Sequence, residues 1–411
     1  MGEINDEASH GDVPDEGLLL LPSLVFSAFA TWIPWVLAGL LLIDIGESFG
    51  VPVGLTGQIR TLSSLIGVLM AFIMGALSVR FSHKALLLIS LSFIALSALA
   101  CSAAPNFLVV LLSYSILGIP MATVLPMTTS LVADHLPVDE RAGAVGWIIA
   151  GTALAGILGA PAINYIAGMG GWRLPFLIFI LPINLLSIAL VLKGIPPKQP
   201  HENVEENREE GVGLLEGFRE VYSNTSAIAC ILGYALSLTA FQAIGFYSPS
   251  FYRQHFMVSK NFASLLVSGL YLCLTLGSLA SGRLVDSLGR KRVTVSTAVI
   301  AGILVLGFTN TPDRWVSLTC SLLGYFFAGA LISSSHSLAL EQIPKFRGTV
   351  MSLNSGAEKL GAALGSGLGG LVINLYGWSV MGVVLGVTGV ASSMTYQLLA
   401  VDPTTKGKTQ S

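Results

Sequence analysis

The chain alternates between long apolar stretches and short polar segments. Each stretch approaches or exceeds about 20 residues, the length that a helix needs to cross the hydrocarbon core of a bilayer. Gly and Pro interrupt several stretches, which membrane helices tolerate because neighbouring groups satisfy the freed backbone. The pattern predicts an all-α membrane protein with twelve transmembrane helices, at residues 20–43, 55–79, 86–104, 107–132, 143–167, 174–192, 225–249, 262–281, 293–310, 315–338, 348–373 and 378–400.

The second half of the chain repeats the first. Two long, glycine-rich apolar stretches each begin with Arg and end with Gly-Trp. The residue pairs that match share one offset of 206 positions: Arg141/Arg347, Leu158/Leu364, Gly159/Gly365, Gly171/Gly377 and Trp172/Trp378. Several matches at one offset indicate a duplication. Parallel repeats in an apolar chain are typical of secondary transporters. We therefore expect two six-helix bundles related by a pseudo-two-fold axis along the membrane normal.

Polar segments divide the chain around these bundles. The longest insert, 193–222, is rich in Glu and is expected to link the bundles 20–192 and 223–401, with a short surface helix at 213–222. An acidic tail precedes them at 1–19, and a second tail follows at 402–411. The first tail lacks a basic n-region and a small-residue cleavage site, so no cleaved signal peptide is expected.

The basic residues of the loops predict the orientation. Fifteen Lys and Arg residues lie on the side of the linker and both termini. The opposite side carries only four, Arg173, Arg253, Lys260 and Arg314. Cytoplasmic loops are enriched in Lys and Arg. We expect both termini and the linker to face the cytoplasm of a plasma or inner cell membrane.

Composition excludes several classes of protein. Residues are 53% hydrophobic and 11% charged, whereas soluble domains carry about 25% charged residues. The net charge of −2 argues against a nucleic-acid partner. Four cysteines in or at the end of apolar stretches have no metal-binding spacing. No nucleotide-binding loop or nucleophile motif is present. We expect a monomer in the lipid bilayer, without cofactor, metal or enzyme activity, that handles a small-molecule substrate.

A motif between the eighth and ninth spans points to a family. It reads Gly282-Arg-Leu-Val-Asp286-Ser-Leu-Gly289-Arg290-Lys291-Arg292. This resembles the cytoplasmic-loop signature of the major facilitator superfamily, Gly-x-Leu-x-Asp-x-x-Gly-Arg-Lys/Arg. The resemblance, over residues 20–400, implies the major facilitator fold and a gating role for this loop and for Arg141. The basic run also fits simple positive-inside anchoring.

The first bundle carries a degenerate copy of that motif. Gly75-Ala-Leu-Ser-Val79-Arg80 has Val79 where the family has Asp. We expect an asymmetric cytoplasmic latch. In an outward-facing state, Asp286 should lie near the first turn of the fifth helix, at 142–144, because a helix N-terminus favours a carboxylate.

Two further stretches resemble the drug/proton antiporter branch. Arg141-Ala-Gly-Ala-Val-Gly-Trp, followed by Gly151, Gly156, Gly159 and Pro161, resembles its fifth helix, with Gly159-Ala160-Pro161 replacing an adjacent Gly-Pro. Arg347-Gly-Thr-Val-Met-Ser-Leu-Asn-Ser resembles the opening of its eleventh helix. One feature departs from the branch: Tyr114 stands four residues before Gly118, where the antiporters carry an Arg associated with proton coupling.

Three charged residues are expected within the membrane. Glu358 and Lys359 lie near the middle of the eleventh span, and Arg60 lies about a turn inside the outer end of the second. Such charges are costly and mark functional sites. We predict that Glu358 couples transport to protons; alternatively it belongs to a fixed ion pair. Lys359 points about 100° away on the helix and is not expected to pair with Glu358. Arg60 could do so in one conformation.

Further polar and aromatic residues are expected to line a central cavity. Together with Arg60 and Lys359 they are Asn354, Gln242, Tyr247, Tyr325, Trp32, Trp35, Tyr114 and Asn164. The aromatic residues fit interfacial or packing roles equally well. Asp44 and Glu47 are expected to be solvated loop residues or partners of Arg60. His336 is expected to be a satisfied helix-end histidine rather than a proton relay.

The preferred interpretation is a secondary transporter that works by alternating access. We expect proton-coupled efflux of a small organic or amphipathic solute. The alternative is an organic-anion carrier or facilitator, because Arg60 and Lys359 against Glu358 leave one net positive charge. A non-transporting receptor on the same fold is the third possibility, but a receptor would be expected to carry a large soluble domain or a long tail, and the short linker and C-terminal tail argue against it.

Overall fold

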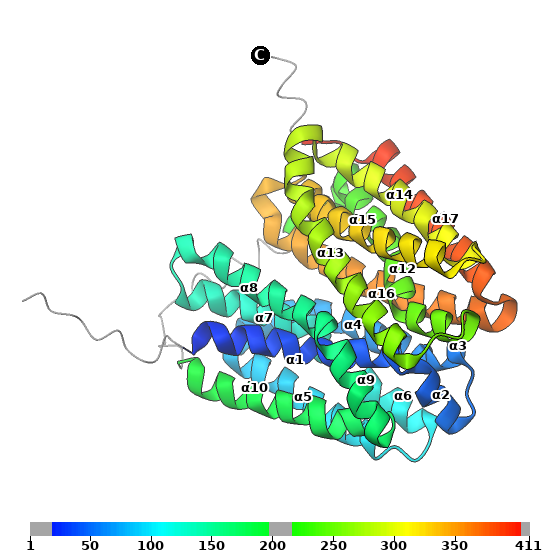
Figure 1. Cartoon of the computed structure of the whole chain (residues 1–411). Helices are drawn as coiled ribbons and strands as arrows, with labels where there is room; N and C mark the ends of the chain where they lie inside the picture. Colours follow the sequence, from blue (N-terminus) through cyan, green and yellow to red (C-terminus); the bar gives the residue numbers. More distant parts are fainter. Residues whose placement is uncertain (1–18, 197–215, 404–411) are drawn as a thin grey trace, which may run out of the picture.

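The computed structural model describes residues 19–196 and 216–403, apart from the side chains of residues 75, 76 and 79. The predicted acidic tail, most of the linker and most of the C-terminal tail lie outside these residues, as does the Val79 side chain. The described residues are helical and contain no strand. The chain folds into two pseudo-symmetric bundles of membrane-spanning helices, as predicted (Figure 1).

Several spans consist of two consecutive helical segments. The segments of the first bundle are α1 (Leu20–Leu40), α2 (Leu42–Phe49), α3 (Val53–Thr56), α4 (Gln58–Arg80), α5 (His83–Ser102), α6 (Phe107–Ser115), α7 (Gly118–His135), α8 (Val138–Ile157), α9 (Gly159–Gly170), η2 (Phe176–Ile180) and α10 (Leu181–Gly194). Those of the second bundle are α12 (Thr225–His255), α13 (Lys260–Leu288), α14 (Arg290–Asn310), α15 (Arg314–Leu340), η3 (Pro344–Phe346), α16 (Arg347–Tyr376) and α17 (Trp378–Leu399). Residues 216–223, which overlap the surface helix predicted at 213–222, are also helical.

Eleven of the twelve predicted spans are long and apolar enough to cross a membrane within the described residues. The exception is α16, which has 30 residues. Its glycine, serine and asparagine residues and the adjacent Glu358 and Lys359 lower its hydropathy. It packs against α12, α4 and α17, so it lies between the bundles rather than at their edge.

Small residues let α16 approach α12 closely. A Cβ added at Gly361 would lie 2.6 Å from the carbonyl oxygen of Ala235, and one at Gly369 would lie 3.1 Å from the Tyr247 ring. Gly365 faces the Thr239 backbone with as little room. The spacing of four residues thus builds the small-residue helix face that the sequence predicts.

A proline divides the fifth span. The segment α8 ends at Ile157, and α9 begins at Gly159. Pro161 has no N–H and therefore frees the carbonyl of Ile157, four residues earlier. The Ser268 hydroxyl, from α13 of the other bundle, donates to this carbonyl at 2.7 Å. The Gly-Ala-Pro sequence thus creates an acceptor that the second bundle uses.

The bundles meet at one end and diverge toward the other (Figure 1). We call the first the contact end; it carries the connections near 50–52, 171–175, 256–259, 311–313 and 377. The second is the open end, with the connections near 81–82, 136–137, 289 and 341–346. Among the described residues, each hydrogen bond between the bundles lies at or toward the contact end. These bonds join the following pairs of residues: Gly54 and Asn374, Arg60 and Gln242, Thr61 and Ser366, Asp44 and Arg253, Asp44 and Lys260, Asn164 and Asn261, and Ser268 and Ile157.

Candidate substrate and coupling sites between the bundles

Arg60 lies buried between the bundles, in the first turn of α4. Its side chain is only 4% exposed. The guanidinium carbon lies 3.8 Å from the centroid of the Trp35 ring and 4.8 Å from that of Phe246. One terminal nitrogen donates to Gln242 Oε1 at 2.5 Å. Arg60 Nε has no hydrogen-bond partner in the described part of the chain. Two aromatic rings and one amide therefore hold this cation.

A small pocket of about 30 Å³ opens beside Arg60. It brings together four of the predicted residues, Arg60, Trp35, Gln242 and Tyr325, which come from α4, α1, α12 and α15. Helices of both bundles thus build one site.

Tyr271, from α13, also lines this pocket and was not among the predicted residues. A signal was present in the sequence. Ser264, Ser268, Tyr271 and Thr275 follow helical spacing and place polar groups along one face of α13. Gly156 of the other bundle lies against the Tyr271 ring, with no room for a Cβ. This face therefore belongs to the contact between the bundles.

The remaining predicted cavity residues lie elsewhere. Tyr247 donates to the carbonyl of Ser366 at 2.7 Å, and Tyr114 donates to that of Pro34 at 2.8 Å. Both rings are buried, and each hydroxyl bonds to a neighbouring helix. Trp32 packs edge-on against Trp35, with 6.1 Å between ring centroids. Asn164 donates to Asn261 at 2.6 Å between the bundles. None of these four lines the pocket beside Arg60.

Glu358 and Lys359 form an ion pair on α16, which corrects the prediction from helix geometry. Lys359 Nζ lies 2.9 Å from Glu358 Oε1. The Cα–Cβ directions of adjacent residues diverge by about 100°, but the long, flexible Lys side chain can bend so that its ammonium reaches the neighbouring carboxylate. Burial favours pairing, because an isolated charge in an apolar interior is costly. The Lys359 side chain is 7% exposed and that of Glu358 is 24% exposed. Arg60 does not pair with Glu358 in this conformation.

Other polar groups surround the Glu358–Lys359 pair. The Tyr234 ring of α12 and the His336 ring of α15 pack with 4.9 Å between centroids, and His336 interacts electrostatically with Glu358. Asn354, one turn earlier on α16, is 1% exposed, and neither polar side-chain atom has a hydrogen-bond partner within the described residues. The carboxylate therefore lies in a polar cluster of the second bundle.

Asp44 joins the bundles at the contact end, so the prediction of a solvated residue or an Arg60 partner was wrong. Its carboxylate lies 2.6 Å from Arg253 Nη1 and also accepts from Lys260 Nζ. The Asp44 and Arg253 side chains are only 13% and 11% exposed. Two cations from α12 and α13 hold one carboxylate from α2. Glu47 is exposed, as expected.

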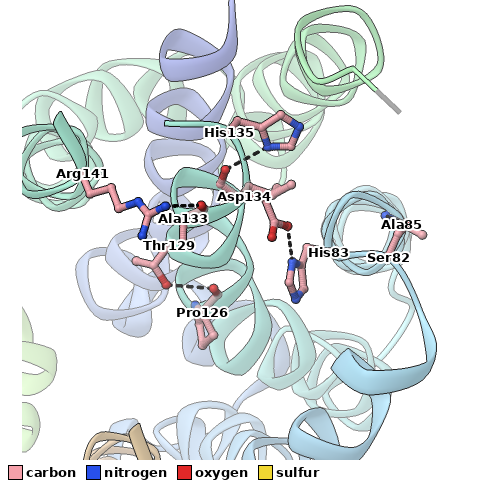
Figure 2. A network of polar contacts seen from close by, with 10 residues as sticks. Ser82, His83, Ala85, Pro126, Thr129, Ala133, Asp134, His135 and Arg141 are labelled. Atoms are coloured by element: carbon pink, nitrogen blue, oxygen red, sulfur yellow. Dashed lines mark hydrogen bonds and ion pairs between the residues drawn. The ribbon is translucent and has the colours of Figure 1, made fainter. Parts of the chain in front are cut away.

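At the open end, polar side chains of the first bundle bond within that bundle. Figure 2 shows Arg141 turned back toward α7, where it donates to the carbonyls of Ala133 at 2.8 Å and Leu136 at 3.0 Å. His83 Nδ1 lies 2.7 Å from Asp134 Oδ2, and the same view shows these two side chains turned toward each other. Arg141 thus caps the negative end of α7, where a cation is favoured.

Basic residues in and near the signature loop likewise contact their own bundle. Arg290 and Arg347 lie 3.5 Å and 3.8 Å from Glu341. Gly289 ends α13 with φ +88, a left-handed conformation that favours glycine, and Gly282 is exposed. Asp286 is exposed and has no hydrogen bond or ion pair with any described residue. In this conformation the predicted latch carboxylate is unused.

Comparison with known proteins agrees with this architecture. The family model of the Major Facilitator Superfamily matches residues 20–259 and 230–411. The MFS-type transporter YceJ of Bacillus subtilis is 27% identical over 373 residues, covering 89% of this chain and 91% of its own. A probable sugar efflux transporter of Pasteurella multocida is 26% identical (84% and 82% covered), and multidrug resistance protein 2 of B. subtilis is 24% identical (76% and 80%).

Solved structures share the fold. A bacterial homolog of the human lysosomal transporter Spinster, in an inward-facing and unoccupied conformation, superposes with a TM-score of 0.72 and 18% identity, over 94% of this chain and 95% of that one. A second structure of that homolog, inward-facing and occupied, gives a TM-score of 0.71 at 17% identity, over 92% and 93%. The duplicated bundles, the signature loop and the match along both halves lead to one conclusion: the chain belongs to the Major Facilitator Superfamily of membrane transporters.

Proposed function

We propose that the protein exports a small organic solute by alternating access and is driven by protons that move inward. Relatives named as sugar efflux and multidrug resistance proteins support the direction of transport. The excess of Lys and Arg in the loops of the open end supports a cytoplasmic position for that end. In this orientation the conformation is inward-facing.

The Glu358–Lys359 pair is the observation that carries the proposal. Glu358 is a titratable carboxylate on α16, the helix that packs against both bundles, and is partly exposed. In the outward-facing state it would take up a proton from outside. In the inward-facing state the Lys359 ammonium favours the carboxylate and promotes proton release to the cytoplasm. Protonation of Glu358 would leave the buried Lys359 ammonium without a counter-charge, which is costly, so protonation would be linked to conformation.

Glu358→Gln tests this coupling. The full-length variant in proteoliposomes should lose solute accumulation driven by a pH gradient, because the amide cannot exchange a proton. Solute exchange without a gradient should persist. The matched control is Glu47→Gln, because Glu47 is exposed at the contact end, and it should behave as the wild type. Unchanged pH dependence in Glu358→Gln would assign Glu358 a structural role.

An organic-anion facilitator without proton coupling is the second candidate. The observation that favours it is again the ion pair, since adjacent residues of one helix can stay paired in both conformations. Glu358 would then stay ionised and paired, and the net positive charge of Arg60 and Lys359 against Glu358 would attract the anion. This function predicts that Glu358→Gln leaves anion transport unchanged or strengthens it, and that Arg60→Ala or Lys359→Ala removes anion binding.

A further inference from the structure

We propose that Arg60 binds the carboxylate of the transported solute, so that the substrates are small organic acids with a planar or aromatic body. This inference rests on the proposed transport function, but it does not depend on proton coupling. It assigns the substrate head group to the pocket between α1, α4, α12, α13 and α15.

Two aromatic rings lie against the guanidinium group of Arg60. Its carbon is 3.8 Å from the centroid of the Trp35 ring and 4.8 Å from that of the Phe246 ring, and a polar ligand would bind through the N–H edge of the group. A guanidinium group has five N–H donors in one plane. Gln242 accepts from one terminal nitrogen, and Nε has no partner within the described chain. A carboxylate offers two oxygens at the spacing that this edge prefers.

The charge of the site is not balanced within the described chain. Arg60 has no carboxylate within ion-pair distance there, because Asp44 is held by Arg253 and Lys260 and Glu358 is held by Lys359. The three charged residues predicted within the membrane carry +1 for Arg60, +1 for Lys359 and −1 for Glu358, a net charge of +1. An anion would compensate the buried excess charge, whereas a neutral sugar would not.

The pocket has the size of a head group. Its volume of about 30 Å³ corresponds to roughly two or three water molecules, at 10–15 Å³ each on the same measure. Tyr271, Tyr325 and Trp35 surround it and offer ring surfaces to the adjoining part of the solute. A carboxylate bound at Arg60 would therefore have aromatic neighbours for its first ring or chain atoms.

Calorimetric titration of the purified full-length protein tests the assignment. The probes are benzoate and 1-naphthoate, each compared with its neutral amide, benzamide or 1-naphthamide. The wild type should bind at least one acid tenfold or more tightly than its amide. Arg60→Gln should erase this preference. Arg60→Lys should keep a smaller preference, because the lysine charge remains while the planar donor edge is lost.

Two further variants keep the test decisive if Arg60→Gln does not fold. Gln242→Glu places an internal carboxylate beside Arg60 and should weaken acid binding at least tenfold. Arg173→Gln is the matched control, because Arg173 also lies over two rings, Trp172 and Phe49, yet donates to the carbonyl of Ala104 at 2.9 Å. It should bind the acids as the wild type does.

Three outcomes would overturn the proposal. They are equal affinity for acids and amides in the wild type, unchanged acid binding in both Arg60→Gln and Gln242→Glu, and no binding of either acid. Failure here is distinct from failure of proton coupling. Binding of acids by Arg60 can persist while Glu358→Gln leaves the pH dependence unchanged, and a neutral solute can be driven by protons without using Arg60.

Discussion

The two ends of the molecule use their polar residues in opposite ways. At the contact end, Asp44 of the first bundle binds Arg253 and Lys260 of the second. At the open end, Arg141 bonds to the end of α7, and Arg290 and Arg347 approach Glu341 of their own bundle. One set of charges holds the bundles together, whereas the other is satisfied inside each bundle and leaves them apart.

The difference shows what a change of conformation would require. Closing the open end must release or supplement contacts such as Arg141 with α7, while opening the other end must break the bonds of Asp44. Exposed ion pairs contribute about 0.2–1 kcal/mol each, and buried ones cost more to break. With a few such contacts on each side, the free energies of the two conformations differ by only a few kcal/mol. A transporter that populates both conformations needs such a small difference.

The largest effect on this balance is expected from Asp44→Ala. The substitution removes the carboxylate and leaves Arg253 and Lys260 as neighbouring cations, so it should destabilise the closed contact end by about 1–3 kcal/mol, or roughly 5- to 150-fold. Pulsed electron resonance between spin labels at positions 47 and 257 should report a longer distance between the bundles at this end.

Asp313→Asn is the matched control for Asp44→Ala. It also removes a carboxylate at the contact end, but Asp313 bonds only within its own helix, accepting from the backbone N–H groups of Trp315 at 2.7 Å and Val316 at 3.1 Å. The spin-label distance distribution of Asp313→Asn should match that of the protein without this substitution. An unshifted distance distribution in Asp44→Ala would mean that the ion pairs of Asp44 do not hold this end closed.

The same contrast separates what the sequence could predict from what it could not. The spans follow from runs of apolar residues along one segment, and the break near Pro161 follows from the chemistry of one residue. Both are local. The partners of Asp44 lie about 210 residues away, and they meet only in a conformation that closes the contact end. No periodicity within α2 contains that information.

Side-chain length explains the failed prediction at Glu358 and Lys359. A helical projection gives the direction of each Cα–Cβ bond but not the position of a charge at the end of a flexible chain. The pocket beside Arg60 was partly predictable, because buried polar and aromatic residues on different spans tend to meet. Which of them met depended on helix rotation. Tyr325 and Gln242 line the pocket beside Arg60, whereas Tyr247 donates to the Ser366 carbonyl.

Asp286→Asn probes the open end and should have a smaller effect. Asp286 has no partner among the described residues here, so the substitution should leave the present conformation intact and remove a contact that forms when the open end closes. The expected partner is the segment 142–144, which in the structure lies one turn after the start of α8 at Val138 and after the acidic Asp139 and Glu140. We expect a several-fold slower transport rate in proteoliposomes and a larger population with the open end apart.

Val79→Ala provides the matched control in the other bundle. Val79 occupies the equivalent motif position but carries no charge, so its truncation should change the transport rate little. Equal effects of Asp286→Asn and Val79→Ala would contradict an asymmetric latch. The asymmetric latch would also be contradicted if the spin-label distance in Asp286→Asn changed at the contact end but not at the open end.

The smallest effect is expected from a neutral bond between the bundles. Ser268 donates to the Ile157 carbonyl that Pro161 leaves free. Ser268→Ala should weaken the closed contact end by about 0.5–1.5 kcal/mol, measured with the same pair of spin labels. Ser264→Ala is the control, because that hydroxyl donates to Asn261 of its own helix at 2.8 Å. Pro161→Ala supplies a helical N–H for the same carbonyl, so Ser268→Ala should cost less in that background. A double-mutant cycle isolates this coupling, and strictly additive effects would mean that the bond does not depend on the proline.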